Sequence, residues 1–197
     1  MFRLIFRPGI GLGLVKTLLV RPSTIVIATA RNEASAKSLR ETLDAAPRGA
    51  ESGYSTFILD LGALASPENI RERFIVETNG AIKRIDVFIS NAGQASSLGP
   101  ALDTTAQQLR SHFETNSIAP LVLFQAFWPL MERAGGLSAI RPPKVFMLSS
   151  SVGSIGAQEP VPGGAYGPSK AALNWIARRL HFEFDQAGLV SVSVHPG

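Results

Sequence analysis

Cysteine is absent from this chain of 197 residues. Its absence excludes disulfide bonds, thiolate nucleophiles and cysteine-ligated metals, and it fits an intracellular protein. Histidine is scarce as well, and His112, His181 and His195 are scattered singly rather than at the spacing of metal ligands. A surface or structural role is the simpler interpretation for each of them. The sequence therefore favours chemistry that needs neither a thiol nor a metal ion.

Long apolar runs and concentrated charge are also missing. The first 30 residues contain arginines and no acidic residue, which superficially resembles a targeting segment, but glycines and Lys16 interrupt any signal-peptide core. A mitochondrial presequence stays a minor alternative. No apolar stretch is long enough to cross a membrane, and the basic residues behind the net charge of +4 are dispersed. We therefore expect a cytoplasmic protein with neither a membrane nor a nucleic-acid partner.

Short apolar or β-branched runs alternate with longer amphipathic segments along the whole chain, which is typical of a parallel sheet covered by helices. Sequential β-α-β units cross over right-handed, so the fold class expected is α/β, a doubly wound Rossmann-like sheet with helices on both faces. One domain over residues 1–197 accommodates it, since 45% of the residues are hydrophobic. We expect strands at residues 24–29, 55–59, 85–90, 144–149 and 190–195. We expect helices at residues 11–19, 34–45, 67–78, 105–133 with a break near Asn116, and 166–187.

A glycine-rich turn precedes the first helical pattern. Gly9, Ile10 and Gly11 stand where a pyrophosphate could approach the backbone and the N-terminus of the helix. Glycine spacing alone is a weak signal, and an ordinary glycine-rich turn is an equal alternative.

Other candidate residues follow the expected strands, where doubly wound sheets bind their ligands. Asn91, Ala92 and Gly93 form a small-residue turn that suits a cofactor ribose. Asp60 either accepts a hydrogen bond from an adenine amino group or caps a turn, with equal weight for the two. Arg31 occupies a position where an NAD-binding domain normally has an acidic residue, and an arginine there suits a 2'-phosphate. This position favours NADP(H) over NAD(H).

Tyr166 and Lys170 are the most informative pair. Residues four apart in a helix share a face, so the Lys170 ammonium is expected beneath the Tyr166 phenol. A free tyrosine has a pKa of about 10, and a fixed cation nearby favours the phenolate, which makes a tyrosine useful as a general acid. Ser150, in a run of three serines after an apolar segment, is the hydroxyl expected to hold a substrate carbonyl toward this phenol. Ser149 and Ser151 are expected to be turn or strand-end residues.

Together these residues resemble the short-chain dehydrogenase/reductase family over nearly the whole chain. The resemblance implies that the tyrosine donates or accepts the proton. It implies that the lysine lowers the pKa of the tyrosine and holds the nicotinamide ribose, and that the serine orients the substrate oxygen. It also implies that an asparagine maintains a helix break and a water that links the lysine to a proton relay. The matching residues are Gly9, Ile10 and Gly11, then Asn91, Ala92 and Gly93, then Asn116, Ser150, Tyr166 and Lys170, and finally Pro196 and Gly197.

Two departures from the family pattern lie at the ends of the chain. Leu4 and Ile5 stand where the family has Thr-Gly, and Pro8 directly precedes Gly9. We therefore expect an altered first strand and weakened phosphate binding, because Ile5 lacks the conformational freedom of glycine. The chain ends at Gly197, so we also expect the family's last strand and substrate lid to be absent, with an exposed sheet edge.

The residues around Gly9 and Tyr166 are similar to those of sniffer-like carbonyl reductases and fungal norsolorinic acid ketoreductases. The resemblance implies an NADPH-dependent reductase that interconverts a ketone and a secondary alcohol, with a small hydrophobic carbonyl or alcohol substrate and a role in secondary metabolism. Homo-oligomerisation is left open. The alternative is a catalytically impaired remnant that acts as a non-catalytic partner or regulatory protein. A serine hydrolase is disfavoured because residues 167–171 lack the last glycine of a Gly-x-Ser-x-Gly elbow.

Overall fold

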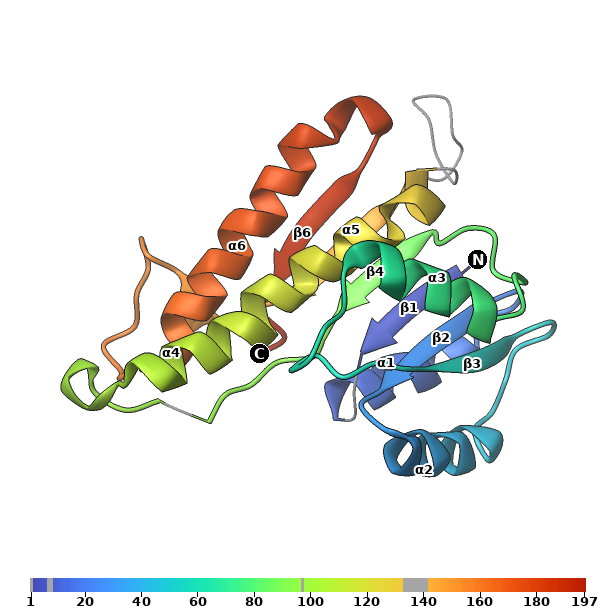
Figure 1. Ribbon diagram of the computed structural model, residues 1–197, viewed down its shortest axis with the longest axis horizontal. Helices are drawn as coiled ribbons and strands as arrows, with labels where there is room; N and C mark the ends of the chain where they lie inside the picture. Colours follow the sequence, from blue (N-terminus) through green and yellow to red (C-terminus); the bar gives the residue numbers. More distant parts are fainter. Residues whose placement is uncertain (1, 7–8, 97, 133–141) are drawn as a thin grey trace.

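The computed structural model describes residues 2–6, 9–96, 98–132 and 142–197, and its described strands form one parallel sheet (Figure 1). The strand order is β3-β2-β1-β4-β5-β6, and every neighbouring pair is parallel. The order reverses between β1 and β4, as the doubly wound fold requires. The strands are β1 (Phe2–Phe6), β2 (Ile25–Ala30), β3 (Gly53–Ile58), β4 (Val87–Ser90), β5 (Lys144–Leu148) and β6 (Val190–Val194).

Helices cover both faces of the sheet, so the predicted α/β class is confirmed. One apolar core joins the sheet to α3, α5 and α6, and a second joins it to α1 and α2. In the central strand β4 all four side chains are buried, as expected for a strand covered on both faces. The helices are α1 (Ile10–Leu19), α2 (Glu33–Asp44), α3 (Pro67–Glu77), α4 (Ala106–Phe113), α5 (Ala119–Glu132) and α6 (Tyr166–Glu183).

Local signals explain where several helices begin. The Asn32 side chain accepts a hydrogen bond from the Ser35 amide at the start of α2, and Ser66 caps α3 in the same way. Thr105 and Gln108 form a reciprocal capping box at the start of α4. These caps place the helix starts within one residue of the predicted positions.

The first strand forms although its residues depart from the family pattern. Its backbone is a five-residue strand at the centre of the sheet, where Leu4 pairs with Ile27 of β2 and with Phe88 of β4. Replacing Thr-Gly by Leu4 and Ile5 does not prevent this pairing, because sheet hydrogen bonds use backbone groups. Pro8 lies outside the described residues. At the other end, β6 is an edge of the described sheet, opposite the β3 edge.

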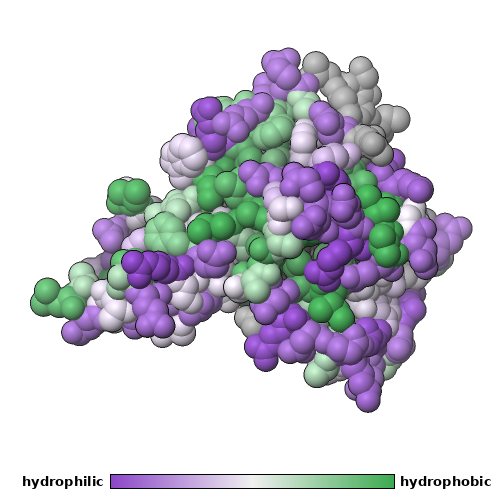
Figure 2. Space-filling view, viewed as in Figure 1, coloured by the Kyte–Doolittle hydropathy of each residue, from purple (hydrophilic) through white to green (hydrophobic). Residues whose placement is uncertain are grey.

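The two ends of the molecule differ in surface character. Figure 2 shows mainly hydrophilic side chains around α2, whereas hydrophobic side chains are visible over α5 and α6. Exposed apolar residues on and near these helices include Ile118, Trp175 and Phe182.

Candidate active site

Asn116 lies in a π-helical turn that joins α4 to α5. This turn, η2 (Glu114–Ile118), keeps the chain helical but widens its hydrogen-bonding pattern, so the predicted break is a change of helix type. Asn116 is fully buried. Its Oδ1 accepts a hydrogen bond from the Gln94 amide at 2.7 Å, and its Nδ2 donates to the Gln94 carbonyl at 2.9 Å. Asn116 thus fixes the loop after β4 to the helix.

A serine network carries this connection on to α6. Asn116 Nδ2 also donates to Ser169 Oγ at 2.9 Å, and that hydroxyl donates to the Tyr166 carbonyl at 2.7 Å. A second bond, from Ser117 Oγ to the Ser169 carbonyl at 2.8 Å, also joins η2 to α6. The first turn of α6 is therefore held against η2 by buried polar contacts.

Lys170 lies at the centre of the site and is almost completely buried. Its Nζ donates a hydrogen bond to the Leu148 carbonyl at the end of β5, at 2.7 Å. The same nitrogen lies 5.7 Å from the centroid of the Tyr166 ring, as the spacing of four residues predicted. Burial lowers the pKa of Lys170 from 10.5 to about 8, because removal from water disfavours the charged ammonium.

Gly93 lies directly against this ammonium. A Cβ at position 93 would come within 3.3 Å of both Lys170 Nζ and Asn116 Oδ1. The small-residue turn after β4 therefore leaves room for the lysine and asparagine side chains. Asn91 is half-buried and Ala92 is buried in the same turn.

Ser150 follows β5 with an extended backbone, and the short 3-10 turn η3 (Ser151–Gly153) comes directly after it. It is half-buried, and so is Tyr166, the first residue of α6. The hydrogen bonds of the described residues do not link the two hydroxyls directly. Ser149 differs from Ser150 because it is buried and its Oγ has no hydrogen-bond partner among the described residues.

A groove of about 680 Å³ runs past the carboxyl ends of β2, β3 and β4. Arg31, Asp60 and Gly93 line it. Asp60 Oδ1 accepts a hydrogen bond from the Gly62 amide at 3.0 Å, so the turn-capping interpretation is correct, and Asp60 still faces the groove. Arg31 is exposed and also lines a neighbouring cavity of about 460 Å³ beside α2.

The glycine turn forms the start of α1. Gly9 has a φ of 85°, a conformation that favours glycine, and its carbonyl accepts hydrogen bonds from the Leu12 and Gly13 amides. Ile10 is exposed and Gly11 is buried. At the far end of the chain, Pro196 and Gly197 follow β6 and are exposed.

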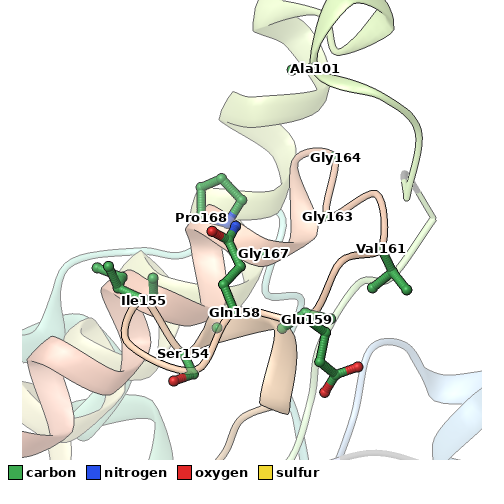
Figure 3. A pocket seen from close by; sticks show the side chains of 13 residues that line it. Ala101, Ser154, Ile155, Gln158, Glu159, Val161, Gly163, Gly164, Gly167 and Pro168 are labelled. Atoms are coloured by element: carbon green, nitrogen blue, oxygen red, sulfur yellow. The ribbon is translucent and has the colours of Figure 1, made fainter.

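A second cavity, of about 480 Å³, lies between η3, the start of α6 and the loop that precedes it (Figure 3). Gln158, Glu159 and Val161 of the loop that precedes α6 line the cavity. Most of the other lining residues are small or apolar.

Gln94 and Ser169 are contact residues that the sequence prediction missed. Gln94 follows the small-residue turn directly, and its side chain accepts a hydrogen bond from Ser111 and donates one to Ser96. Ser169 lies between Tyr166 and Lys170 in sequence. Their positions next to the recognised motifs are the signal by which sequence reasoning could have found them. Their hydrogen-bond partners are distant in sequence, so only the folded chain reveals these contacts.

The residues that the structure describes contain no group of three potential metal ligands among His, Cys, Asp and Glu. His112 is buried, with Nδ1 2.8 Å from the Gln108 carbonyl, and His181 Nδ1 lies 3.1 Å from the Leu189 carbonyl. In the same described part of the chain, no helix combines the length and the apolar character needed to span a membrane.

Comparison with known proteins identifies the family. The model of the short chain dehydrogenase family matches residues 7–197. This chain belongs to the short-chain dehydrogenase/reductase family. It is an oxidoreductase of that family, and its Rossmann-like sheet and the Tyr166–Lys170 arrangement agree with that membership.

Curated relatives of this short-chain dehydrogenase include fungal enzymes. A norsolorinic acid ketoreductase from Emericella nidulans is 34% identical, with 96% of this chain and 68% of the relative covered. An uncharacterised oxidoreductase from Schizosaccharomyces pombe is 35% identical, with 96% and 69% covered.

Two solved structures of carbonyl reductases are similar to this fold. An NADPH-bound carbonyl reductase from chicken fatty liver aligns with a TM-score of 0.83 at 28% identity, covering 100% of this chain and 75% of that one. The carbonyl reductase Sniffer of Drosophila melanogaster aligns with a TM-score of 0.82 at 27% identity, covering 99% and 79%. The predicted resemblance to sniffer-like reductases and norsolorinic acid ketoreductases is thereby confirmed.

Proposed function

We propose that this chain interconverts a ketone and a secondary alcohol with NADP(H), and that Tyr166 exchanges the proton with the substrate oxygen. The observation that carries the proposal is the buried Lys170 ammonium, which the Leu148 carbonyl holds beside the Tyr166 ring. A fixed cation beside a phenol stabilises the phenolate that proton transfer leaves behind.

The groove at the strand ends fits a nicotinamide dinucleotide. It extends from Arg31 and Asp60 to Gly93, and the absence of a side chain at Gly93 leaves the approach to Lys170 and Asn116 open. When bound, the nicotinamide supplies or accepts the hydride. The residues proposed to hold the cofactor are Gly9, Ile10, Gly11, Arg31, Asp60, Asn91, Ala92, Gly93, Tyr166, Lys170, Pro196 and Gly197.

Arg31 supports a preference for NADP(H). Its guanidinium is exposed at the end of β2 and forms no ion pair with the other described residues, so it is available to a 2'-phosphate. The NADPH-bound chicken carbonyl reductase among the similar structures supports the same choice.

Each side chain of the site has a separate role in the proposed proton transfer. Ser150 donates a hydrogen bond to the carbonyl oxygen and orients it. Tyr166 donates its phenolic proton to that oxygen in reduction and accepts it in oxidation. Lys170 stabilises the resulting phenolate, and Asn116 holds the loop after β4 and the start of α6 in place around it.

The substrate proposed is a hydrophobic ketone. The cavity in Figure 3 is lined by Val152, Ile155 and Val161, and its volume of about 480 Å³ suits a small organic molecule. The norsolorinic acid ketoreductases among the relatives support an aromatic polyketide as a first candidate, with a role in secondary metabolism.

The proposal is tested by cofactor binding and by one substitution. NADPH and NADH are titrated by fluorescence against the folded chain, and reduction of aromatic ketones is then assayed. Tyr166→Phe is expected to lower turnover by about 10²- to 10⁴-fold, the contribution of a positioned general acid, and to leave NADPH affinity nearly unchanged.

Tyr54→Phe is the matched control, because Tyr54 is the other tyrosine of the chain and its hydroxyl bonds Asp44, away from the site. Substantial residual turnover in Tyr166→Phe would overturn the role of Tyr166. A folded chain that binds neither nucleotide would instead favour the non-catalytic remnant.

A further inference from the structure

The turn η3 packs against α6 with almost no side chain between the two backbones. A Cβ at Gly153 would lie 2.8 Å from the carbonyl carbon and the Cβ of Lys170, and 3.0 Å from the Ala171 amide nitrogen. Two of these atoms belong to the backbone of α6, and the Lys170 Cβ is bonded directly to that backbone. None of them can rotate away as the end of a flexible side chain can. Any side chain at position 153 therefore requires the helix to move.

Gly153 also connects the two halves of the proposed catalytic group. Its amide donates a hydrogen bond to the Ser150 carbonyl at 3.0 Å, and its carbonyl accepts one from Asn174 Nδ2 at 3.1 Å. Ser150 precedes η3, and Asn174 lies one turn beyond Lys170 on α6. One residue thus contacts the strand end that carries the serine and the helix that carries the tyrosine and lysine.

The close packing of η3 against α6 continues toward the start of the helix. A Cβ at Gly167, next to Tyr166, would lie 3.2 Å from the Val152 carbonyl oxygen. In Figure 3 the segment with Ser154 and Ile155 runs beside the turn of α6 that carries Gly167 and Pro168. Close backbone packing therefore extends from Tyr166 to Lys170.

We propose that Gly153 and Asn174 are positioning residues that set the distance between Ser150 and the Tyr166–Lys170 pair. The inference rests on the proposed function, and neither residue is placed in contact with the reacting atoms. The bond from Lys170 Nζ to the Leu148 carbonyl, 2.7 Å long, also spans from α6 to β5. A displacement of α6 would lengthen this bond and move the phenol away from the serine hydroxyl. Catalytic groups tolerate about 0.5 Å of such error.

The first test compares alanine at two glycines of the same segment. Gly153→Ala is expected to lower kcat by about 100-fold, as a misplacement of about 1 Å can do. The ketone KM and the NADPH Kd are expected to change by a smaller factor, since Gly153 also lines the cavity in Figure 3 and Lys170 is one of several residues proposed to hold the cofactor. Gly156→Ala is the control, since a Cβ there meets no atom within 4 Å and the backbone needs no glycine conformation. The control is expected to retain wild-type kcat. Equal kcat in the two variants would overturn the proposal.

Asn174→Asp provides a second test if Gly153→Ala does not fold. The carboxylate keeps the shape of the side chain but cannot donate to the Gly153 carbonyl, so kcat is expected to fall while KM and the NADPH Kd stay near the wild-type values. A variant with wild-type kcat would show that this bond does not position the helix.

A crystal structure of Gly153→Ala, or of Asn174→Asp, separates this inference from the proposed function. The distance from Lys170 Nζ to the Leu148 carbonyl oxygen is expected to exceed hydrogen-bonding range in the variant, whether or not a substrate has been found. An unchanged distance would overturn the positioning role. Lack of ketone reduction in the wild-type chain would overturn the proposed function alone.

Discussion

At the scale of single residues, the burial of the charged Lys170 lowers the free energy of unfolding. Its pKa is lowered from 10.5 to about 8 by loss of solvation. Between these two pH values the unfolded chain binds more protons than the folded chain, so the free energy of unfolding rises with pH. Below about pH 8 the full cost is present, and it amounts to about 3 kcal/mol at about 1.4 kcal/mol per pKa unit.

Lys170→Met removes the buried charge and tests this cost. The variant is expected to gain most over the wild type below pH 8, and the gain is expected to shrink by about 3 kcal/mol as the pH rises to 10.5. Denaturant unfolding of both proteins across this range measures it, because the difference between them cancels the titration of other groups. A difference that does not vary with pH would contradict the lowered pKa.

At the scale of elements, the site depends on a junction of the β4 loop, η2 and α6. Asn116 satisfies both backbone groups of Gln94 and also bonds Ser169. Asn116→Ala leaves the partly buried backbone groups of Gln94 and the buried Ser169 hydroxyl without this partner, and the total loss expected is about 1–3 kcal/mol. Ser169→Ala removes one of the same bonds, and we expect a loss of about 1 kcal/mol.

The two substitutions are expected to be coupled because they share a hydrogen bond. The double variant should be more stable than the sum of the single losses indicates, by at least about 0.5 kcal/mol. A double-mutant cycle of denaturant unfolding measures the coupling. Strict additivity would show that the Asn116–Ser169 bond contributes nothing to the junction.

At the scale of the whole molecule, the edge strand β6 has an unusual polarity. Val190, Val192 and Val194 are each more than a third exposed, whereas Ser191 is buried on the opposite face. No charged side chain lies within β6, since the strand consists only of valine and serine. Unprotected edges of this kind favour association between chains.

We predict that this chain self-associates through β6 and that Val192→Lys reduces the association without a large loss of stability. Light scattering at increasing protein concentration measures the first effect, and thermal unfolding measures the second. Ser191→Lys is the matched control, because it places the same charge one residue away on the buried face and is expected to destabilise the fold. Unchanged scattering in Val192→Lys would show that β6 is not the associating edge.

The sequence by itself determined the class of fold and the order of its elements. Alternating apolar runs gave the strands to within a few residues, and side-chain caps such as Asn32 and Ser66 fixed the helix starts, because both signals act locally. The spacing of Tyr166 and Lys170 likewise predicted their contact, since four residues complete about one helical turn. The first strand was harder to judge, because Leu4 and Ile5 depart from the family pattern while backbone pairing tolerates them.

Only the tertiary structure decided how the chemically important residues meet. Asn116 contacts Gln94 and Ser169 across 22 and 53 residues of sequence, and no local pattern specifies such partners. The burial that lowers the pKa of Lys170 comes from the packing of α6 against β5 and the turn at Gly93. The close approach of Gly153 to α6 depends on the same packing. Long-range contacts form only when loops close and apolar faces are buried together, so the geometry of the site is a property of the folded chain.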